Sequence, residues 1–188
     1  MESPGKNGDL ADDTMAESVV LVDEDDREIG TMPKALVHGV QTPLHRAFSF
    51  FLFNSKKELL LQQRSSKKKT WPLVWSNSCC GHPSPGEDRG EAVKRRLKDE
   101  LGLTGIEVKE VAPYRYCFTK DGVMENEICP IFIGFSDQEP IINPEEVEAV
   151  RSVPWQEFLE EIRNKPGTYS PWCEEEAEII SRIENIGL

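Results

Sequence analysis

The sequence predicts a mixed α/β fold in which strands and helices pack in layers around one core. Residues 46–53 are almost continuously apolar, which is typical of a central strand buried on both faces. Residues 90–101 repeat apolar side chains at every fourth position, which is typical of a helix with one buried face. Strand-like segments come first and are interleaved, and the amphipathic helical segments follow them.

The chain begins with a polar, acidic stretch, residues 1–17, which we expect to be a disordered tail without a function of its own. Residues 18–22 then form a short apolar strand, followed by an acidic turn and a return strand. After the strand at 46–53 the chain turns, and residues 58–64 make its partner strand. We therefore expect a single domain over residues 18–188.

The central helix is predicted over residues 90–101. Val93, Leu97 and Leu101 lie four residues apart, so they share one apolar face. Gly102 follows directly, at a position where glycine often ends a helix because it accepts a left-handed backbone. The helix is therefore expected to end at Leu101 and to face the core with that stripe.

A β-hairpin is predicted around residues 121–122, whose Asp-Gly sequence favours a two-residue turn. Residues 106–119 and 123–135 on either side are strand-like. With a two-residue turn, paired residue numbers sum to 243, so Tyr116 lies opposite Glu127.

The C-terminal part is predicted to hold one more strand, within residues 145–155, and two amphipathic helices, over 155–163 and 172–186. The second helix would present one apolar face, made of Trp172, Ile179, Ile183 and Ile186.

Composition excludes several classes of protein. The formal charge of −12 argues against a nucleic-acid partner and against an anionic membrane surface, since both require a broad basic face. No stretch is long and apolar enough to span a bilayer. Five cysteines without a disulfide-type spacing are typical of the reducing cytoplasm, where we expect this protein to be located.

Residues 76–83 are the stretch most suited to chemistry, because they place a thiol two residues from an imidazole among small and polar residues. If the segment is extended, Cys80 and His82 point to the same face. Gly81 between them allows a ligand or another backbone segment to approach closely. The alternative is that Cys80 is one of the many buried, unreactive thiols of protein cores.

A metal site is the second chemical possibility. The chain has only three histidines, His38, His45 and His82, and Glu125 and Glu127 project to one face of a predicted strand. Imidazoles and carboxylates together suit a divalent transition metal or magnesium. The alternative is that each histidine makes a local hydrogen bond and that the two glutamates lie on a solvated face.

Residues 81–103 resemble the Nudix box, a loop–helix–loop whose acidic residues hold a divalent cation on a diphosphate. Gly81, Glu87 and Arg95 have its spacing. Two positions depart from it, because Arg96 and Asp99 stand where the box has glutamate. A cation in place of a carboxylate argues against hydrolysis and is compatible with diphosphate binding. The alternative is a charged surface helix with pairs four residues apart, such as Arg96 with Glu100.

Several further motifs, in order, resemble one branch of the Nudix superfamily, the type I isopentenyl-diphosphate isomerases. They are residues 44–49, 71–72, 75–83, 125–127 and 170–172. The resemblance implies a Nudix-type mixed β-sheet sandwiched between helices. It also implies the interconversion of isopentenyl and dimethylallyl diphosphate in isoprenoid biosynthesis, by protonation and deprotonation through a tertiary carbocation.

The resemblance assigns roles to individual residues. Cys80 and Glu127 would be the two catalytic groups on opposite faces of the substrate, and Tyr116 could relay a proton. The implied ligands of one metal are His38, His45, His82, Glu125 and Glu127. Glu100 would help to hold a Mg²⁺ ion carried by the diphosphate. The implied diphosphate contacts are Lys34, Arg64, Lys68 and Arg96.

Trp172 could cover the developing carbocation with its ring face, a cation–π contact. The alternative is that it only packs on the core. The metal at the histidine site could be Mn²⁺, Zn²⁺ or Mg²⁺. The expected partner is a small isoprenyl diphosphate, with no nucleic acid and no membrane, and the chain is expected to be a monomer or a weak homodimer.

Two other functions remain open from the residues alone. A Nudix pyrophosphohydrolase acting on a nucleoside diphosphate derivative would keep the box and the phosphate contacts, but would need neither Cys80 nor the three histidines. A non-catalytic Nudix-like binding module would tolerate substitution of Cys80.

Overall fold

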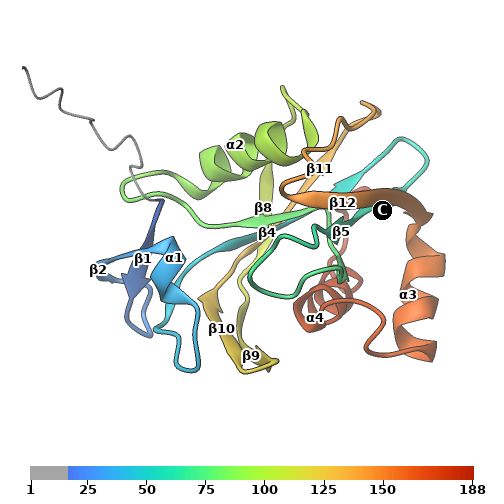
Figure 1. Ribbon diagram of the computed structural model, residues 1–188. Helices are drawn as coiled ribbons and strands as arrows, with labels where there is room; N and C mark the ends of the chain where they lie inside the picture. Colours follow the sequence, from blue (N-terminus) through green and yellow to red (C-terminus); the bar gives the residue numbers. More distant parts are fainter. Residues whose placement is uncertain (1–16) are drawn as a thin grey trace, which may run out of the picture.

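The computed structural model describes residues 17–188. The tail expected over residues 1–17 therefore lies, apart from Glu17, outside the described residues. Two sheets form the centre of the domain (Figure 1). The five-stranded sheet has the order β2 (Glu28–Pro33), β1 (Ser18–Val22), β3 (His45–Arg46), β10 (Val123–Ile128) and β9 (Arg115–Lys120).

The seven-stranded sheet follows the path β12 (Val147–Pro154), β5 (Glu58–Arg64), β4 (Phe48–Phe53), β11 (Ile131–Phe135) and β8 (Lys109–Ala112). Two short strands complete it: β6 (Trp75–Ser76) pairs with β5, and β7 (Cys79–Gly81) pairs with β4.

Helices lie on both sides of the seven-stranded sheet (Figure 1). One side carries α2 (Arg89–Leu101), and the other carries α3 (Trp155–Asn164) and α4 (Pro171–Ile180). A single turn, α1 (Lys34–Val37), lies beside the five-stranded sheet. The expected mixed sheet sandwiched between helices is therefore confirmed.

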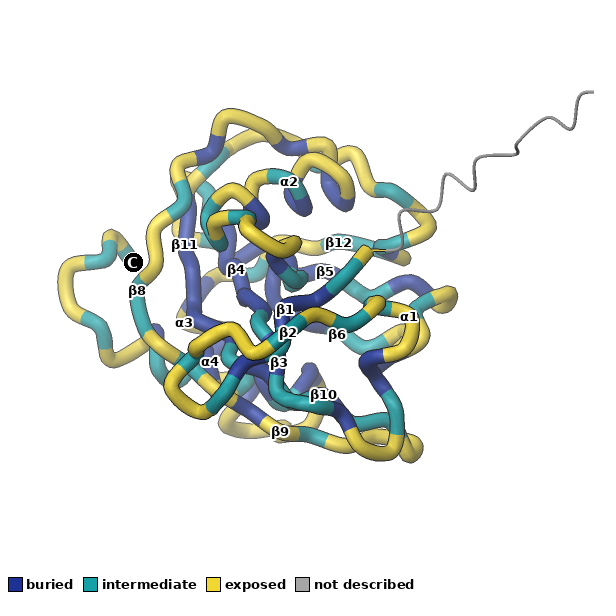
Figure 2. Tube along the Cα trace, turned by 90° about the vertical axis from the view of Figure 1, so that its left-hand side faces the viewer, coloured by how far each residue is buried: buried dark blue, intermediate teal, exposed yellow. Residues whose placement is uncertain are grey.

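Strand β4 is the centre of the core, as the apolar run predicts. All six of its residues are buried (Figure 2). Phe48 and Phe50 pack in the cluster that includes α2, whereas Phe51 and Phe53 pack in the cluster that includes α3 and α4. Because side chains alternate along a strand, one segment supplies apolar groups to both layers.

Helix α2 ends at Leu101 as predicted and begins at Arg89, one residue before the predicted start. The Asp88 side chain accepts hydrogen bonds from the first turn, and Gly102 ends the helix at φ 67°. An added Cβ at Gly102 would also lie 3.1 Å from the Cβ of Ile141, so glycine is required there for space as well as for backbone angle. The helix faces the sheet with the predicted stripe Val93, Leu97 and Leu101, all buried.

The hairpin register is confirmed, with Lys120 opposite Val123 and Tyr116 opposite Glu127. The predicted length of the second strand is not confirmed. The predicted strand over 123–135 is two strands, because the chain leaves one sheet after Ile128 and enters the other at Ile131. Pro130 lies at the crossing, where its missing N–H donor suits a break in the hydrogen-bond ladder.

The last helix was predicted too long. It ends at Ile180, and Arg182 and Ile183 then donate to the carbonyls three residues before them, which tightens the chain into a turn. Ile183 and Ile186 therefore lie beyond the helix. The buried face of α4 is Trp172, Cys173, Glu176, Ala177 and Ile180.

No helix within residues 17–188 combines the length and the apolar character needed to cross a membrane.

Candidate active site

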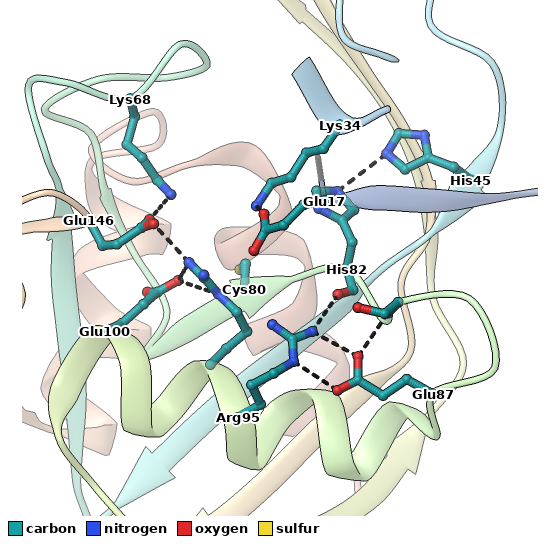
Figure 3. Close-up of polar contacts among 12 residues, drawn as sticks. Glu17, Lys34, His45, Lys68, Cys80, His82, Glu87, Arg95, Glu100 and Glu146 are labelled. Atoms are coloured by element: carbon teal, nitrogen blue, oxygen red, sulfur yellow. Dashed lines mark hydrogen bonds and ion pairs between the residues drawn. The ribbon is translucent and has the colours of Figure 1, made fainter. Parts of the chain in front are cut away.

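A cavity of about 450 Å³ opens between the two sheets, next to strands β7, β9 and β10 and helix α4. Figure 3 shows Cys80 between two groups of polar side chains, with Lys68 and Glu146 to one side and His45 and His82 to the other. The lining thus combines a thiol, imidazoles and carboxylates with several cations.

Four of the predicted metal ligands come together. One ligand atom from each of His38, His45, His82 and Glu127 lies within 4.8 Å of the others. The parallel pairing of β10 with β3 sets Glu127 directly beside His45, while His38 follows α1 and His82 follows β7. Sheet pairing therefore brings together residues that are far apart in the sequence.

Hydrogen bonds orient this cluster. His45 donates from Nδ1 to the carbonyl oxygen of Pro43 at 2.8 Å, since a carbonyl can only accept, and this bond directs Nε2 toward the cluster. That Nε2 lies 3.3 Å from Nε2 of His82 and 3.3 Å from Oε1 of Glu127. Nε2 of His82 lies 2.9 Å from the same carboxylate oxygen. Three nitrogens and one oxygen converging in this way form a donor set that suits a divalent ion.

Electrostatics divide the charges within the cluster. Burial lowers the pKa of His82 to about 4, so this imidazole is neutral at neutral pH. Burial also opposes a charge on His38, but hydrogen bonds and attraction from Glu125 and Glu127 outweigh it and raise the pKa to about 9. For Glu127, burial favours the neutral acid, yet hydrogen bonds from the three histidines hold its pKa well below 4.5.

The remaining two predicted ligands lie differently. Glu125 also lines the cavity, and its Oε2 lies 2.9 Å from Nε2 of His38, so it adjoins the cluster through that histidine. Glu100 lies apart on α2, where it is buried and accepts from Nε of Arg96 at 3.1 Å. Its predicted role with a diphosphate-bound Mg²⁺ stays a prediction.

Cys80 and Cys79 take opposite faces of β7. Cys79 is fully buried in the core on the α2 side, and Cys80 lines the cavity. The Cys80 thiol donates to Oδ1 of Asn77 at 3.1 Å and lies 3.6 Å from Oγ of Ser49. Burial raises the pKa of Cys80 to about 12, so the thiol keeps its proton at neutral pH.

Tyr116 and Trp172 complete the wall around Glu127. The Tyr116 hydroxyl donates to Oε2 of Glu127 at 2.6 Å, while the other carboxylate oxygen faces the histidines. Trp172 stacks on the Tyr116 ring, with centroids 5.6 Å apart, and meets Trp71 edge-on. Trp172 is only 2% exposed, so it both lines the cavity and packs in the core.

The four predicted diphosphate contacts, Lys34, Arg64, Lys68 and Arg96, all line the same cavity. Three of them are paired with carboxylates: Lys34 with Glu17 at 2.6 Å, Lys68 with Glu146, and Arg96 with both Glu100 and Glu146. Arg64 donates to the carbonyl oxygen of Thr70 at 3.2 Å from Nε and 3.0 Å from Nη2. A diphosphate would therefore meet cations that are already held in place.

Sequence reasoning missed three residues at this site. Glu17 and Glu146 pair with cavity cations but lie in stretches without a motif, so no signal identifies them. Asn77 lies within the motif at residues 75–83, but only the three-dimensional structure shows that it contacts Cys80 and Trp172.

The Nudix-box residues are partly structural. Glu87 and Arg95 form an ion pair at 2.7 Å, and Arg95 also donates to the carbonyl oxygen of His82, so the box helps to fix the loop that carries that histidine. A Cβ at Gly81 would lie 3.0 Å from side-chain atoms of Arg96 and Phe48. The groups that approach this glycine are therefore side chains of α2 and β4, and not the predicted ligand or backbone segment.

Comparison with known proteins agrees with this geometry. The NUDIX domain family matches residues 43–173. An isopentenyl-diphosphate Delta-isomerase of Saccharopolyspora erythraea is 47% identical over 167 residues, which cover 87% of this chain and 86% of that protein. The isomerase of the same name from Frankia alni is 42% identical and covers 91% of this chain and 87% of its own length.

Among solved structures, the DR0079 protein of Deinococcus radiodurans superposes with a TM-score of 0.71 at 21% identity, covering 88% of this chain and all of that one. The MutT protein of Methanosarcina mazei superposes with a TM-score of 0.63 at 20% identity, covering 74% and 94%. At such identities these two structures bear on the fold alone. On the family match and the sequence relatives, the chain belongs to the isopentenyl-diphosphate Delta-isomerase family of NUDIX domain proteins.

Proposed function

We propose that this enzyme interconverts isopentenyl diphosphate and dimethylallyl diphosphate, with Cys80 and Glu127 as its two proton-transferring groups. The observation that carries the proposal is that one cavity is lined by the Cys80 thiol, the Glu127–Tyr116 pair, two of the three clustered histidines and five cationic side chains. Hydrolysis of a nucleotide would require neither the thiol nor the histidine cluster.

The reaction moves one double bond. A C–H bond forms at the terminal alkene carbon, which leaves a tertiary cation on the neighbouring carbon. A C–H bond on the other side of the cation then breaks, and its electron pair becomes the new double bond. One group must donate and another must accept a proton, and after each turnover the two have exchanged protonation states.

Cys80 and Glu127 have complementary protonation states at neutral pH. With the pKa of Cys80 raised by burial to about 12, the thiol carries a proton at neutral pH. Glu127 is ionised there, because hydrogen bonds from the histidines overcome the effect of burial on its pKa. The Tyr116 hydroxyl is hydrogen-bonded to Glu127, so it can pass a proton between this carboxylate and the cavity.

Stabilisation of the cation is assigned to the aromatic wall. Trp172 and Tyr116 stack and both line the cavity, and the negative face of an aromatic ring attracts a cation most strongly when water is excluded. An enclosed site also keeps water from adding to the cation.

The divalent ions are assigned to two places. His38, His45, His82 and Glu127, with Glu125 beside them, would hold one ion, for which Mn²⁺, Zn²⁺ and Mg²⁺ are the candidates. When bound, this ion supplies positive charge that alters the proton affinity of the carboxylate it contacts. A Mg²⁺ carried by the diphosphate is assigned to Glu100. The diphosphate itself is assigned to Lys34, Arg64, Lys68 and Arg96, all of which line the cavity.

We further propose that the chain works in the cytoplasm as a monomer or weak homodimer. The five free cysteines in residues 17–188 support a reducing compartment.

The test is a proton NMR time course with isopentenyl diphosphate, Mg²⁺ and metal-loaded enzyme in deuterated water. We expect dimethylallyl diphosphate that carries deuterium in a methyl group, because the added proton comes from groups that exchange with solvent. A folded, metal-loaded sample that converts nothing would contradict the proposal. Phosphate release from a nucleotide panel under the same conditions would favour the pyrophosphohydrolase instead.

A further inference from the structure

Asn77 is a buried side chain behind the reacting groups. It lies between β6 and β7 with no exposed surface, and it belongs neither to the metal cluster nor to the cation set. A buried carboxamide must satisfy two donors and an acceptor, so its hydrogen bonds define what it orients.

The amide orientation of Asn77 is fixed by its donors. Nδ2 donates to the carbonyl oxygens of Phe50 at 3.2 Å and Cys79 at 3.1 Å. Carbonyl oxygens only accept, so exchanging the amide nitrogen and oxygen would face three oxygens toward one another and leave two bonds unmade. The oxygen of Asn77 therefore has a single direction.

That oxygen accepts from the two groups that flank the cavity. Oδ1 accepts from the Cys80 thiol at 3.1 Å and from Nε1 of Trp172 at 3.3 Å, and also from Oγ of Ser76 at 2.8 Å. Cys80 lies on β7 and Trp172 on α4, so one atom joins a thiol on the sheet to an indole on the C-terminal helix.

We propose that Asn77 is a positioning residue of the isomerisation, which holds the Cys80 sulfur and the Trp172 ring in a fixed relation to each other. The inference rests on the proposed function. Proton transfer by Cys80 and stabilisation of the cation by Trp172 act on adjacent carbons of one small substrate, so both groups must be placed together. Asn77 acts through them and does not itself contact the substrate.

The consequence is separable from substrate binding. The diphosphate contacts Lys34, Arg64 and Lys68 lie on α1, on β5 and in the following loop, and make no bond to Asn77. Loss of positioning therefore lowers the rate of the bound complex and leaves affinity nearly unchanged.

The first comparison is Asn77→Ala against Ser78→Ala. Ser78 is the neighbouring residue, equally buried, and its hydroxyl binds the backbone of Leu52 and Leu60, not Cys80 or Trp172. We expect kcat of Asn77→Ala to fall about 10- to 100-fold with KM within about two-fold. Ser78→Ala should keep kcat within about three-fold of the unmutated enzyme, even if its Tm falls as much as that of Asn77→Ala. Equal kcat losses in the two variants would overturn the proposal.

The second readout does not depend on activity. In ¹⁵N-labelled protein the Trp172 indole N–H signal, assigned with Trp172→Phe, should move to lower proton frequency in Asn77→Ala and stay in place in Ser78→Ala. Asn77→Asp, whose neutral carboxyl keeps the acceptor and one donor, should retain the indole signal and most of kcat, and it serves if the alanine variant does not fold. An unmoved indole signal in Asn77→Ala, or an intact signal in Asn77→Asp with kcat lost, would overturn the proposal. Failure of the unmutated enzyme to convert substrate would instead contradict the proposed function.

Discussion

At the scale of single residues, Cys79 provides a matched control for substitutions of the adjacent Cys80. Cys79 and Cys80 share a strand but face opposite sides, Cys79 toward the α2 core and Cys80 toward the cavity. We expect Cys80→Ala to lower kcat by at least about 10³-fold, because a proton-transferring group is lost. Cys79→Ala should keep most activity and lose about 1 kcal/mol of stability from a small cavity. Turnover by NMR and thermal unfolding check both, and comparable activity losses would contradict the assignment.

The metal cluster predicts a pH-dependent metal affinity. Attraction to Glu125 and Glu127 outweighs burial and raises the pKa of His38 to about 9, while burial lowers that of His82 to about 4. At pH 7.5 only His38 of these two is a positively charged imidazolium, and it must lose one proton to coordinate an ion. Binding should therefore release close to one proton at pH 7.5, and affinity should rise with pH up to about 9 and then level off.

Calorimetric titration with Zn²⁺ or Mn²⁺ in buffers of different ionisation enthalpy measures the released protons. His38→Ala is the matched variant: it should bind the ion more weakly and release fewer protons. Metal binding to the unmutated protein with no proton release at pH 7.5 would contradict the charge assigned to His38.

Residue identity located the thiol and the imidazole that line the cavity better than it located the residues that support them. Cys80 and His82 are two residues apart on an extended strand, so their shared face follows from strand geometry. Asn77 and Glu146 could not be predicted, because an asparagine in a polar run and a glutamate in an acidic run have ordinary surface compositions. Their roles depend on burial and on partners from distant segments, which sequence does not display.

At the scale of elements, α4 carries a buried acid in its apolar face. Glu176 is fully buried, and neither carboxyl oxygen has a well-formed hydrogen bond within residues 17–188. Burial raises the pKa of Glu176 well above 4.5, with only partial relief from the nearby Ser49 hydroxyl. Above pH 4.5 the unfolded chain releases this proton and the folded protein keeps it, so stability falls as pH rises toward the folded-state pKa.

Glu176→Gln keeps the shape of the side chain and removes the titration. We expect its Tm to exceed that of the unmutated protein by a few degrees at pH 7, and the difference to shrink as pH is lowered toward 4.5. Glu178→Gln on the same helix, where the acid is paired with Arg163 on the surface, is the control and should not show this trend. A pH-independent difference in Glu176→Gln would show that the acid does not stay protonated.

Elements were predictable where local chemistry decided them. The Asp-Gly turn predicted the hairpin register, and Gly102 predicted the C-terminal end of α2. The end of α4 was missed because Ile183 and Ile186 continue the apolar spacing after the helix stops, while Glu176, an acidic residue type, interrupts the apolar pattern of the face that is buried. Tertiary packing decided that case, and a buried carboxyl cannot be told from an exposed one by its residue type.

At the scale of the whole molecule, the site exists only because two sheets meet. The cluster draws on four separate segments, which carry His38, His45, His82 and Glu127. The parallel pairing of β10 with β3 places Glu127 beside His45. Such long-range pairing has no local signal, so the residues alone left the histidines unconnected. The resemblance to a family predicted that they share one site, and the fold shows how strand pairing places them there.

The charge of the whole molecule opposes its substrate, and the cavity must reverse that effect locally. The chain has 34 acidic against 22 basic residues, yet five cationic side chains line one cavity. The Debye length is about 10 Å at 0.1 M salt and about 3 Å at 1 M, so distant acids are already screened at the lower concentration. Raising salt then weakens mainly the attraction of the nearby cations, and KM for isopentenyl diphosphate should rise.

Lys68→Gln should raise KM about ten-fold at 0.1 M salt and make KM depend less on salt, since a charge-assisted phosphate contact is removed. Lys165→Gln, an exposed lysine after α3, should change neither quantity. A KM that falls with salt would mean that the overall negative charge, and not the cavity, governs binding of the diphosphate.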